Sequence, residues 1–220
     1  MPRLYIAILT LSRLEAKISS MTETTYHHGD LKNALIQAGM EILAEEGLGR
    51  LSLRKVAKQA GVSHAAPYSH FKDKQALIAA ISTEGFKRLY SQIQAIFEQY
   101  QDKPDTLLVE TAWAYFQFAL NETDCFKLMF SSTLEKEKDY PDFVAASKKT
   151  FSQLVEIVKV CQTGGVLEEG AADLAAVRLW STVHGFISLL LEGQISSTVT
   201  DGRDLKTLLM DVLDIRKNQN

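Results

Sequence analysis

Apolar residues recur along this chain every three or four positions, the spacing that places them on one face of an α-helix. The first such run spans residues 31–46. It follows Asp30, a residue type that caps helices, and precedes Gly47, a residue type that ends them. Nowhere does the sequence alternate polar and apolar residues for long enough to predict a strand. The pattern therefore predicts an all-α protein.

Three further helices are expected before residue 100, each behind a side chain that can cap it. Ser52 precedes a short helix, and Ser63 precedes a helix of about two turns that ends near Phe71, with a glycine-containing turn between the two. Asp73 precedes a long helix that continues through Phe97 and joins the two halves of the chain.

The second half of the chain carries longer helical patterns, separated by proline, glycine and charged segments. We expect its helices at 104–120, 123–131, 141–163, 171–196 and 203–216.

The net charge of −3 hides an uneven distribution along the chain. Residues 47–90 hold eight basic side chains against two acidic ones, so this segment carries +6 and the remainder carries −9. A basic block on an acidic protein is typical of a surface that binds a polyanion, because neutralising phosphates releases their counterions. A solvated basic helix surface is the alternative interpretation.

The two short helices and their turn have the arrangement of a helix-turn-helix, whose second helix enters the major groove of DNA. Ala65 and Ala66 are small enough to allow close approach to the bases. Hydrogen-bonding and charged side chains in and after this helix are His64, Tyr68, Ser69, His70 and Lys74. Lys74 also stands at the start of the next helix, where backbone N–H groups favour a phosphate. The segment therefore predicts a double-stranded DNA partner.

The segment from Leu51 to Ile81 resembles the DNA-binding domain of the TetR family of bacterial regulators. The motifs that carry the resemblance are Ala57-Lys-Gln-Ala-Gly-Val-Ser63 and Tyr68-Ser-His-Phe-Lys-Asp-Lys74. Residues 26–90 share the likeness. The resemblance implies that phosphates are contacted by Ser52, Tyr68, His70 and Lys74. It also implies that bases are approached by Ser63, His64, Ala65 and Ser69.

Pro67 departs from the aliphatic residue usual at its position in that family. Because proline lacks an N–H, it makes an irregular first turn possible and puts the individual base contacts in question.

The helix expected at 171–196 is apolar on more than one face, so it must be covered on several sides. A second subunit is the natural cover, which predicts a homodimer through the helices at 171–196 and 203–216. The run from Trp180 through His184 to Gly185 resembles the WHG-type C-terminal domain of a TetR subgroup.

Aromatic residues cluster in the second half at helical spacing, and they are either core or the walls of a ligand cavity. As cavity walls, they would favour a partly apolar small-molecule effector. The candidate walls are Trp113, Phe116, Phe126, Phe130, Trp180 and His184. For His184, the alternative to an effector contact is a buried histidine bonded to a neighbour.

The family resemblance implies a repressor that binds a palindromic operator as a dimer and is released by an effector. A helical DNA-binding adaptor or architectural protein with no effector is the alternative. An enzyme is not expected, because the sequence has no phosphate-binding glycine loop, nucleophile elbow or HExxH motif.

Cysteine usage and the N-terminal sequence decide the remaining expectations. Cys125 and Cys161 show no metal-ligand spacing, so we expect no metal, no cofactor and a reducing cytoplasm. The apolar run at residues 4–11 is far shorter than the ~20 residues that span a bilayer, so no membrane partner is expected.

We expect residues 1–20 to be a disordered extension or the product of an upstream start, because Met21 opens a segment typical of a protein start. A DNA-binding domain is expected at 21–75 and a helical effector and dimerisation domain at 76–220.

Overall fold

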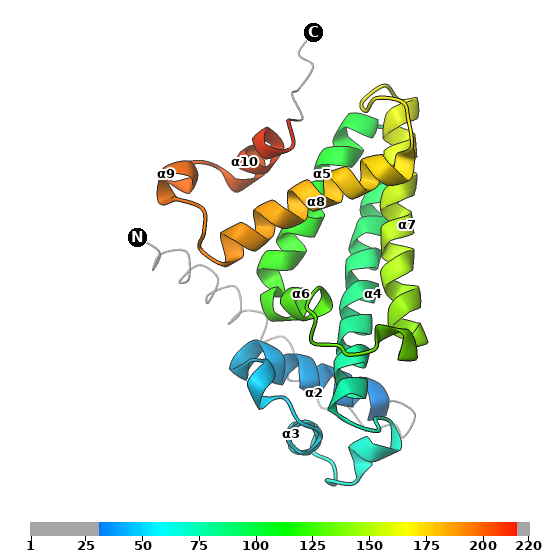
Figure 1. Ribbon diagram of the computed structural model, residues 1–220, viewed down its shortest axis with the longest axis vertical. Coiled ribbons are helices and arrows are strands. Elements are labelled where there is room, and N and C mark those ends of the chain that lie inside the picture. The colour runs from blue at the N-terminus through cyan, green and yellow to red at the C-terminus, as the bar shows by residue number, and fades with distance from the viewer. Residues whose placement is uncertain (1–30, 215–220) are drawn as a thin grey trace. The chain divides into compact units, whose positions relative to one another are not determined.

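The computed structural model describes residues 31–214, and every regular element in that range is helical (Figure 1). The expectations for residues 1–20 and for the start of a domain at Met21 lie outside this range. Contacts divide the chain into residues 1–33 and 34–220, and the packing described below lies within the second unit.

The helix-turn-helix region comprises four short elements followed by the long helix α4. Their bounds are α2 (Leu31–Glu46), η1 (Leu48–Arg50), α3 (Leu53–Gln59), η2 (Ala66–Ser69) and α4 (Lys74–Tyr100). Two of the predicted caps are confirmed. The side chain of Ser52 accepts a hydrogen bond from Lys55 N at 3.3 Å, and that of Asp73 accepts one from Ala76 N at 2.8 Å.

The core of this region forms where α2, α3 and the turn after η2 pack on the first part of α4. Fully or almost fully buried side chains include Leu35, Val56, Phe71 and Leu77. At Gly39 of α2, an added Cβ would lie only 2.8 Å from Ile81 Cδ1 of α4. The absence of a side chain at Gly39 therefore allows these two helices to approach closely.

The prediction of a two-turn helix after Ser63 is wrong, because the segment contains only the 3₁₀ turn η2. Pro67 is the physical reason. In an α-helix that began at Ser63, residue 67 would have to donate an N–H to an earlier carbonyl, and the proline ring would collide there. Ala66 N instead bonds to Ser63 O and Tyr68 N to Ala65 O, and the missing donor of Pro67 falls between these bonds.

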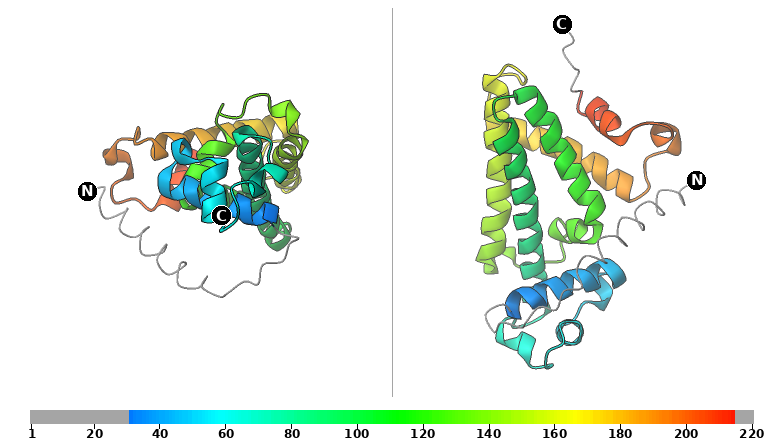
Figure 2. Two further views of the ribbon diagram at one scale, coloured as in Figure 1. Left: turned by 90° about the horizontal axis from the view of Figure 1, so that it is seen from below. Right: turned by 180° about the vertical axis from the view of Figure 1, so that it is seen from behind.

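The second half consists of helices packed on the remainder of α4. Their bounds are α5 (Pro104–Asn121), α6 (Thr123–Met129), η3 (Glu137–Asp139), α7 (Pro141–Thr163), α8 (Ala172–Leu191), α9 (Ser197–Thr200) and α10 (Leu205–Val212). Helix α4 packs against α5, α6 and α7, and α8 packs against α5 and α7. Figure 2 shows α8 crossing these long helices at an angle rather than running parallel to them.

The last two predicted helices are present but shorter than expected. The helix predicted at 171–196 ends at Leu191, and the one predicted at 203–216 spans Leu205–Val212. The loop predicted between them contains the single turn α9. Helix α8 is long and apolar enough to cross a membrane by length and composition alone, and 22% of that window is buried within the protomer. Leu174 is 68% exposed and Leu189 51% exposed, so part of this apolar helix faces outward.

Candidate DNA interface and effector cavity

Every side chain predicted to contact DNA lies on the surface. The exposed residues are Ser52, Ser63, His64, Ala65, Tyr68, Ser69, His70 and Lys74. The large ring of Tyr68 is 56% exposed, although the neighbouring Pro67 is buried. A large aromatic side chain that protrudes from a tight turn gains little from packing, so its exposure fits a role in recognition.

Several of these side chains also have partners inside the protein. Ser52 caps α3, Ser69 Oγ donates to Ala66 O at 2.7 Å, and Lys74 Nζ donates to Leu48 O at 3.1 Å. Lys55 forms an ion pair with Glu46. These bonds fix the turn while leaving Tyr68 and the two histidines projecting from it.

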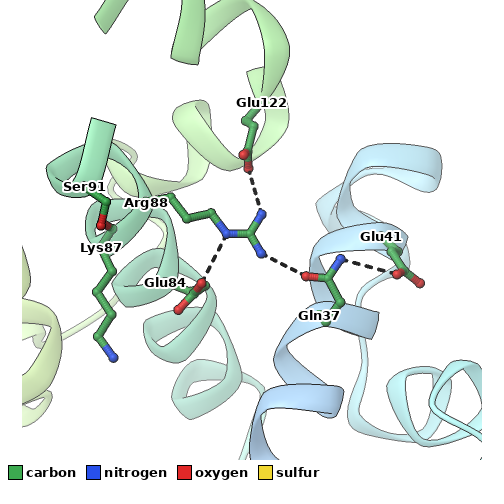
Figure 3. A network of polar contacts seen from close by, with 7 residues as sticks. All are labelled: Gln37, Glu41, Glu84, Lys87, Arg88, Ser91 and Glu122. Carbon is green, nitrogen blue, oxygen red and sulfur yellow. Dashed lines mark hydrogen bonds and ion pairs between the residues drawn. The ribbon is translucent and has the colours of Figure 1, made fainter. Parts of the chain in front are cut away.

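Arg88 of α4 joins the helix-turn-helix region to the second half of the chain (Figure 3). Its guanidinium donates to Glu84 Oε1 at 3.1 Å, to Gln37 Oε1 of α2 at 2.8 Å, and to Glu122 Oε2 at the α5–α6 junction at 3.5 Å. Gln37 Nε2 continues the chain of bonds to Glu41 at 3.4 Å. The fork of donors on one arginine thus holds three elements together. In the sequence, Arg88 stands out only as one of the positive charges of residues 47–90.

A second connection runs from the first turn of α4 to the loop between α6 and α7, residues 130–140. Gln75 Nε2 donates to Thr133 O at 3.2 Å, and Gln75 Oε1 accepts from Glu135 N at 3.1 Å. Gln75 follows Lys74 directly, so one amide fixes the α6–α7 loop against the helix that follows the turn predicted to contact DNA. No sequence signal pointed to this glutamine.

A cavity of about 330 Å³ lies among helices α4, α5, α7 and α8, and the α6–α7 loop supplies part of its wall. This volume lies within the range of small-molecule sites. Twenty residues of the described part of the chain line it, and fifteen of these are aliphatic or aromatic. The polar remainder is Thr111, Ser131, Glu137, Ser147 and Thr150.

Two of the six predicted cavity walls, Phe130 and Trp180, line the cavity. The other four, Trp113, Phe116, Phe126 and His184, are not among its lining residues. Phe116 and Phe126 are buried in the core at 0% and 2% exposure, and Trp113 stacks on Phe116. Helical spacing shows which residues point inward, but it does not show where the packed interior leaves space.

Trp180, Tyr115 and His184 form a chain of hydrogen bonds at one side of the cavity. Trp180 Nε1 lies 3.0 Å from Tyr115 Oη, which lies 2.8 Å from His184 Nδ1. Because an indole N–H can only donate, the tyrosine oxygen accepts from Trp180. The direction of the bond between Tyr115 Oη and His184 Nδ1 depends on the tautomer of the imidazole.

Burial favours the neutral forms of both partners in this chain. It lowers the pKa of His184 below 6.5 and raises the pKa of Tyr115 above its usual range. The bond to Tyr115 agrees with the alternative interpretation of His184, a histidine bonded to a neighbour.

Thr111 is the unusual polar residue of the lining. It is 4% exposed, and its Oγ1 is a buried side-chain oxygen for which the described part of the chain offers no hydrogen-bond partner. The other lining threonine, Thr150, donates to Ala146 O at 3.0 Å. An unpaired buried hydroxyl costs about 1–3 kcal/mol, so a ligand that bonds to it gains affinity.

Two known families match separate parts of the chain. Residues 35–81 match the family described as bacterial regulatory proteins, tetR family, and residues 108–213 match the tetracyclin repressor-like C-terminal domain. The chain belongs to the TetR family. The WHG-type motif within it stays a prediction.

Relatives along most of the chain agree with this family. A solved structure of a protein of unknown function from Rhodococcus sp. RHA1 is 31% identical, covers 87% of this chain and 96% of its own, and has a TM-score of 0.71. The TetR-family regulator PfmR of Thermus thermophilus is 19% identical over 84% of this chain and 98% of its own, with a TM-score of 0.61. The uncharacterized HTH-type regulator YobS of Bacillus subtilis is 25% identical over 74% of this chain and 80% of its own.

Membership of the TetR family identifies the protein as a non-enzymatic, DNA-binding regulator of transcription. Regulators of this family bind DNA operators and act as dimers with small-molecule effectors. Within residues 31–214, no group of three histidine, cysteine or acidic side chains could hold a metal ion. Cys125 and Cys161 are both buried, and burial raises the pKa of the Cys161 thiol to about 11, which keeps it in the unreactive thiol form.

Proposed function

We propose that this TetR-family protein is a cytoplasmic, dimeric repressor that binds a palindromic operator and leaves it when a small, mainly apolar effector enters the cavity. One observation carries the proposal. The α6–α7 loop lines the cavity through Ser131 and Glu137, and the same loop is bonded to Gln75 at the start of α4. Effector and operator thus act on one continuous piece of structure.

The coupling we propose needs two arrangements of α4 and the α6–α7 loop, only one of which sets the reading turns of the dimer one helical turn of DNA apart. An effector that packs against Phe130 and Ser131 changes the position of the loop, and Gln75 transmits this change to the first turn of α4. Arg88 holds the other side of α4 to α2. The bonds of Gln75 to the α6–α7 loop thus join the proposed DNA-binding domain, residues 21–75, to the proposed C-terminal domain, residues 76–220.

The dimer we propose forms through α8 and α10. Leu174 and Val177 of α8 are exposed, and so are Leu189 of α8 and Val212 of α10. An added Cβ at Gly185, also on α8, would meet nothing within 4 Å in the protomer, so that glycine is open to a partner helix. Exposed apolar residues on a helix of this kind mark a protein interface.

The proposal is tested by fluorescence anisotropy with labelled genomic fragments around the protein's own gene, over a series of salt concentrations. We expect tight binding to one fragment, a steep loss of affinity with salt, and release by at least one small apolar compound at saturable concentration. Equal affinity for all fragments would refute the proposal that the protein binds a specific operator. Fragment-specific binding that no compound alters would favour the alternative, an adaptor or architectural protein without an effector.

A further inference from the structure

The charge of the cavity wall restricts what the cavity can bind. Of the twenty lining residues within 31–214, none is lysine, arginine or histidine, and one, Glu137, carries a carboxylate. An anionic group placed among such walls would lose its hydration without gaining a cation, which is costly in an apolar interior. The lining therefore selects against carboxylates and phosphates.

The hydrogen-bonding groups of the wall restrict the ligand further. Tyr115 and Trp180 are bonded to each other, and Tyr115 is also bonded to His184. Thr150 Oγ1 is bonded to a backbone carbonyl, and so is Ser147 Oγ. Thr111 Oγ1 differs from these atoms because it is both buried and without a partner in the described residues. This oxygen has almost no accessible surface in the structure, so the Thr111 side chain must turn about χ1 before its hydroxyl reaches a ligand. A hydroxyl can donate and accept, so a ligand alcohol or carbonyl can then bond to it.

We propose that the cavity binds an uncharged, largely aromatic or aliphatic molecule whose single polar group is a hydroxyl or carbonyl bonded to Thr111 Oγ1. This inference rests on the proposed function, because it names the chemical class of the effector. A cavity of about 330 Å³ lies within the range of small-molecule sites, so the ligand is a small molecule.

The aromatic share of the wall supports this class. Six lining residues are aromatic, namely Phe86, Tyr115, Phe130, Phe143, Phe151 and Trp180. Phe86 already makes edge contacts with Phe130 at 5.4 Å and with Phe143 at 5.7 Å between ring centroids. A further ring is accommodated by walls of this kind through the same edge contacts.

The experiment uses four matched probes with the full chain: phenylpropanol, phenylpropanoate, phenylpropylamine and propylbenzene. They share one ring and a three-carbon chain and differ in the terminal group, which is neutral and polar, anionic, cationic or absent. Isothermal titration calorimetry at neutral pH measures each affinity. We expect phenylpropanol to bind at least tenfold more tightly than phenylpropanoate. Equal or tighter binding of the anion would overturn the proposal, and so would the absence of binding by phenylpropanol.

A pair of threonine variants tests the contact with Thr111. Thr111→Val keeps the shape of the side chain and removes the hydroxyl, so phenylpropanol should lose about three- to tenfold in affinity while propylbenzene is unaffected. Thr150→Val is the matched control, because that hydroxyl is bonded within the protein and its loss should not separate the two probes. An equal loss for both probes in Thr111→Val would overturn the assigned contact.

Glu137 provides the test against a cationic ligand. If phenylpropylamine binds more tightly than phenylpropanol, and Glu137→Gln abolishes the difference, the effector is a cation and the proposal of an uncharged ligand is wrong. Operator binding is measured separately in the same preparations. An operator complex that dissociates only with other compounds would leave the proposed function intact and refute this ligand class. If phenylpropanol binds but no fragment is bound as an operator, the ligand class stands and the proposed function is refuted.

Discussion

The proposed DNA-reading turn and the proposed effector cavity are built in opposite ways. The turn is made of consecutive residues, from Ser63 to Lys74, whose polar side chains are exposed and whose caps are local. The cavity collects its walls from four long helices and a loop, and Thr111 and Glu137 are distant in sequence. A site made of neighbours can be recognised in a sequence, whereas a site made of packed helices becomes visible only in three dimensions.

The strongest test of this contrast is Tyr68→Ala. Because Tyr68 is 56% exposed, its loss should leave the free energy of unfolding unchanged while it removes a proposed phosphate contact. A hydrogen bond to a charged group contributes about 1.5–3 kcal/mol, so operator affinity should fall about 10- to 100-fold.

The measurement for Tyr68→Ala is fluorescence anisotropy, with urea unfolding of the same sample. Tyr68→Phe, which keeps the ring, separates the hydroxyl from the ring. A drop in stability that matches the drop in affinity would show that the turn is part of the core.

Gly85→Ala acts on the other region. An added Cβ at this position of α4 would lie 2.5 Å from Met129 Sδ and 2.7 Å from Cys125 Sγ, so these two side chains of α6 would have to shift. Overpacking of this kind costs about 1–3 kcal/mol, and Met129 is also a cavity wall, so both stability and ligand affinity should fall.

Urea unfolding and calorimetry measure these two losses. Gly49→Ala is the control, because a Cβ there would meet nothing within 4 Å. If Gly85→Ala matches this control in stability, α4 and α6 do not approach as closely as the structure places them.

The same contrast explains which predictions succeeded. Ser52 and Asp73 were identified as caps because a cap is a bond between a side chain and a backbone N–H three residues ahead. The prediction of a helix after Ser63 was wrong because it treated Pro67 as a cause of one irregular turn. Proline has no N–H, so the α-helical hydrogen bond at residue 67 cannot form at all.

The cavity could be predicted only in part. Phe130 and Trp180 were among its predicted walls, but Thr111 was not, because an unpaired hydroxyl is a property of the packed interior. Gln75 and Arg88 escaped notice for a related reason. Their partners lie 34 to 60 residues away, and the sequence does not show which polar side chains meet over such distances.

Gln75→Ala tests the link between the two regions. The variant loses both bonds to the α6–α7 loop, but no residue of the reading turn changes. Operator affinity without effector should therefore remain close to that of the native protein, while the effector-induced loss of affinity should shrink by a factor equivalent to about 0.5–2 kcal/mol.

Anisotropy titrations with and without effector measure this coupling factor. Gln94→Ala serves as the control, because Gln94 is on α4 and its side chain bonds only to Tyr90 and Glu98 of the same helix among the described contacts. An unchanged coupling factor in Gln75→Ala would show that Gln75 does not transmit the effect of the effector. Arg88 would then be the next residue to test.

The smallest expected effect concerns pH and His184. Burial lowers the pKa of His184 in the folded protein below the 6.5 of an exposed histidine. Between these two values the unfolded chain binds a proton that the folded protein does not, so the free energy of unfolding falls as the pH falls below 6.5. Above 6.5 both states are neutral and this contribution vanishes.

His184→Asn removes the titrating group, so the difference in unfolding free energy between pH 7.5 and pH 5.5 should be smaller in the variant than in the native protein. Urea unfolding at the two pH values measures it, and comparing the two proteins cancels all other titrations. In the protonated imidazole Nδ1, which lies 2.8 Å from Tyr115 Oη, can only donate to it. If the pH dependence is the same in both proteins, His184 is solvated in the folded state and the chain from Trp180 to His184 does not hold the imidazole neutral.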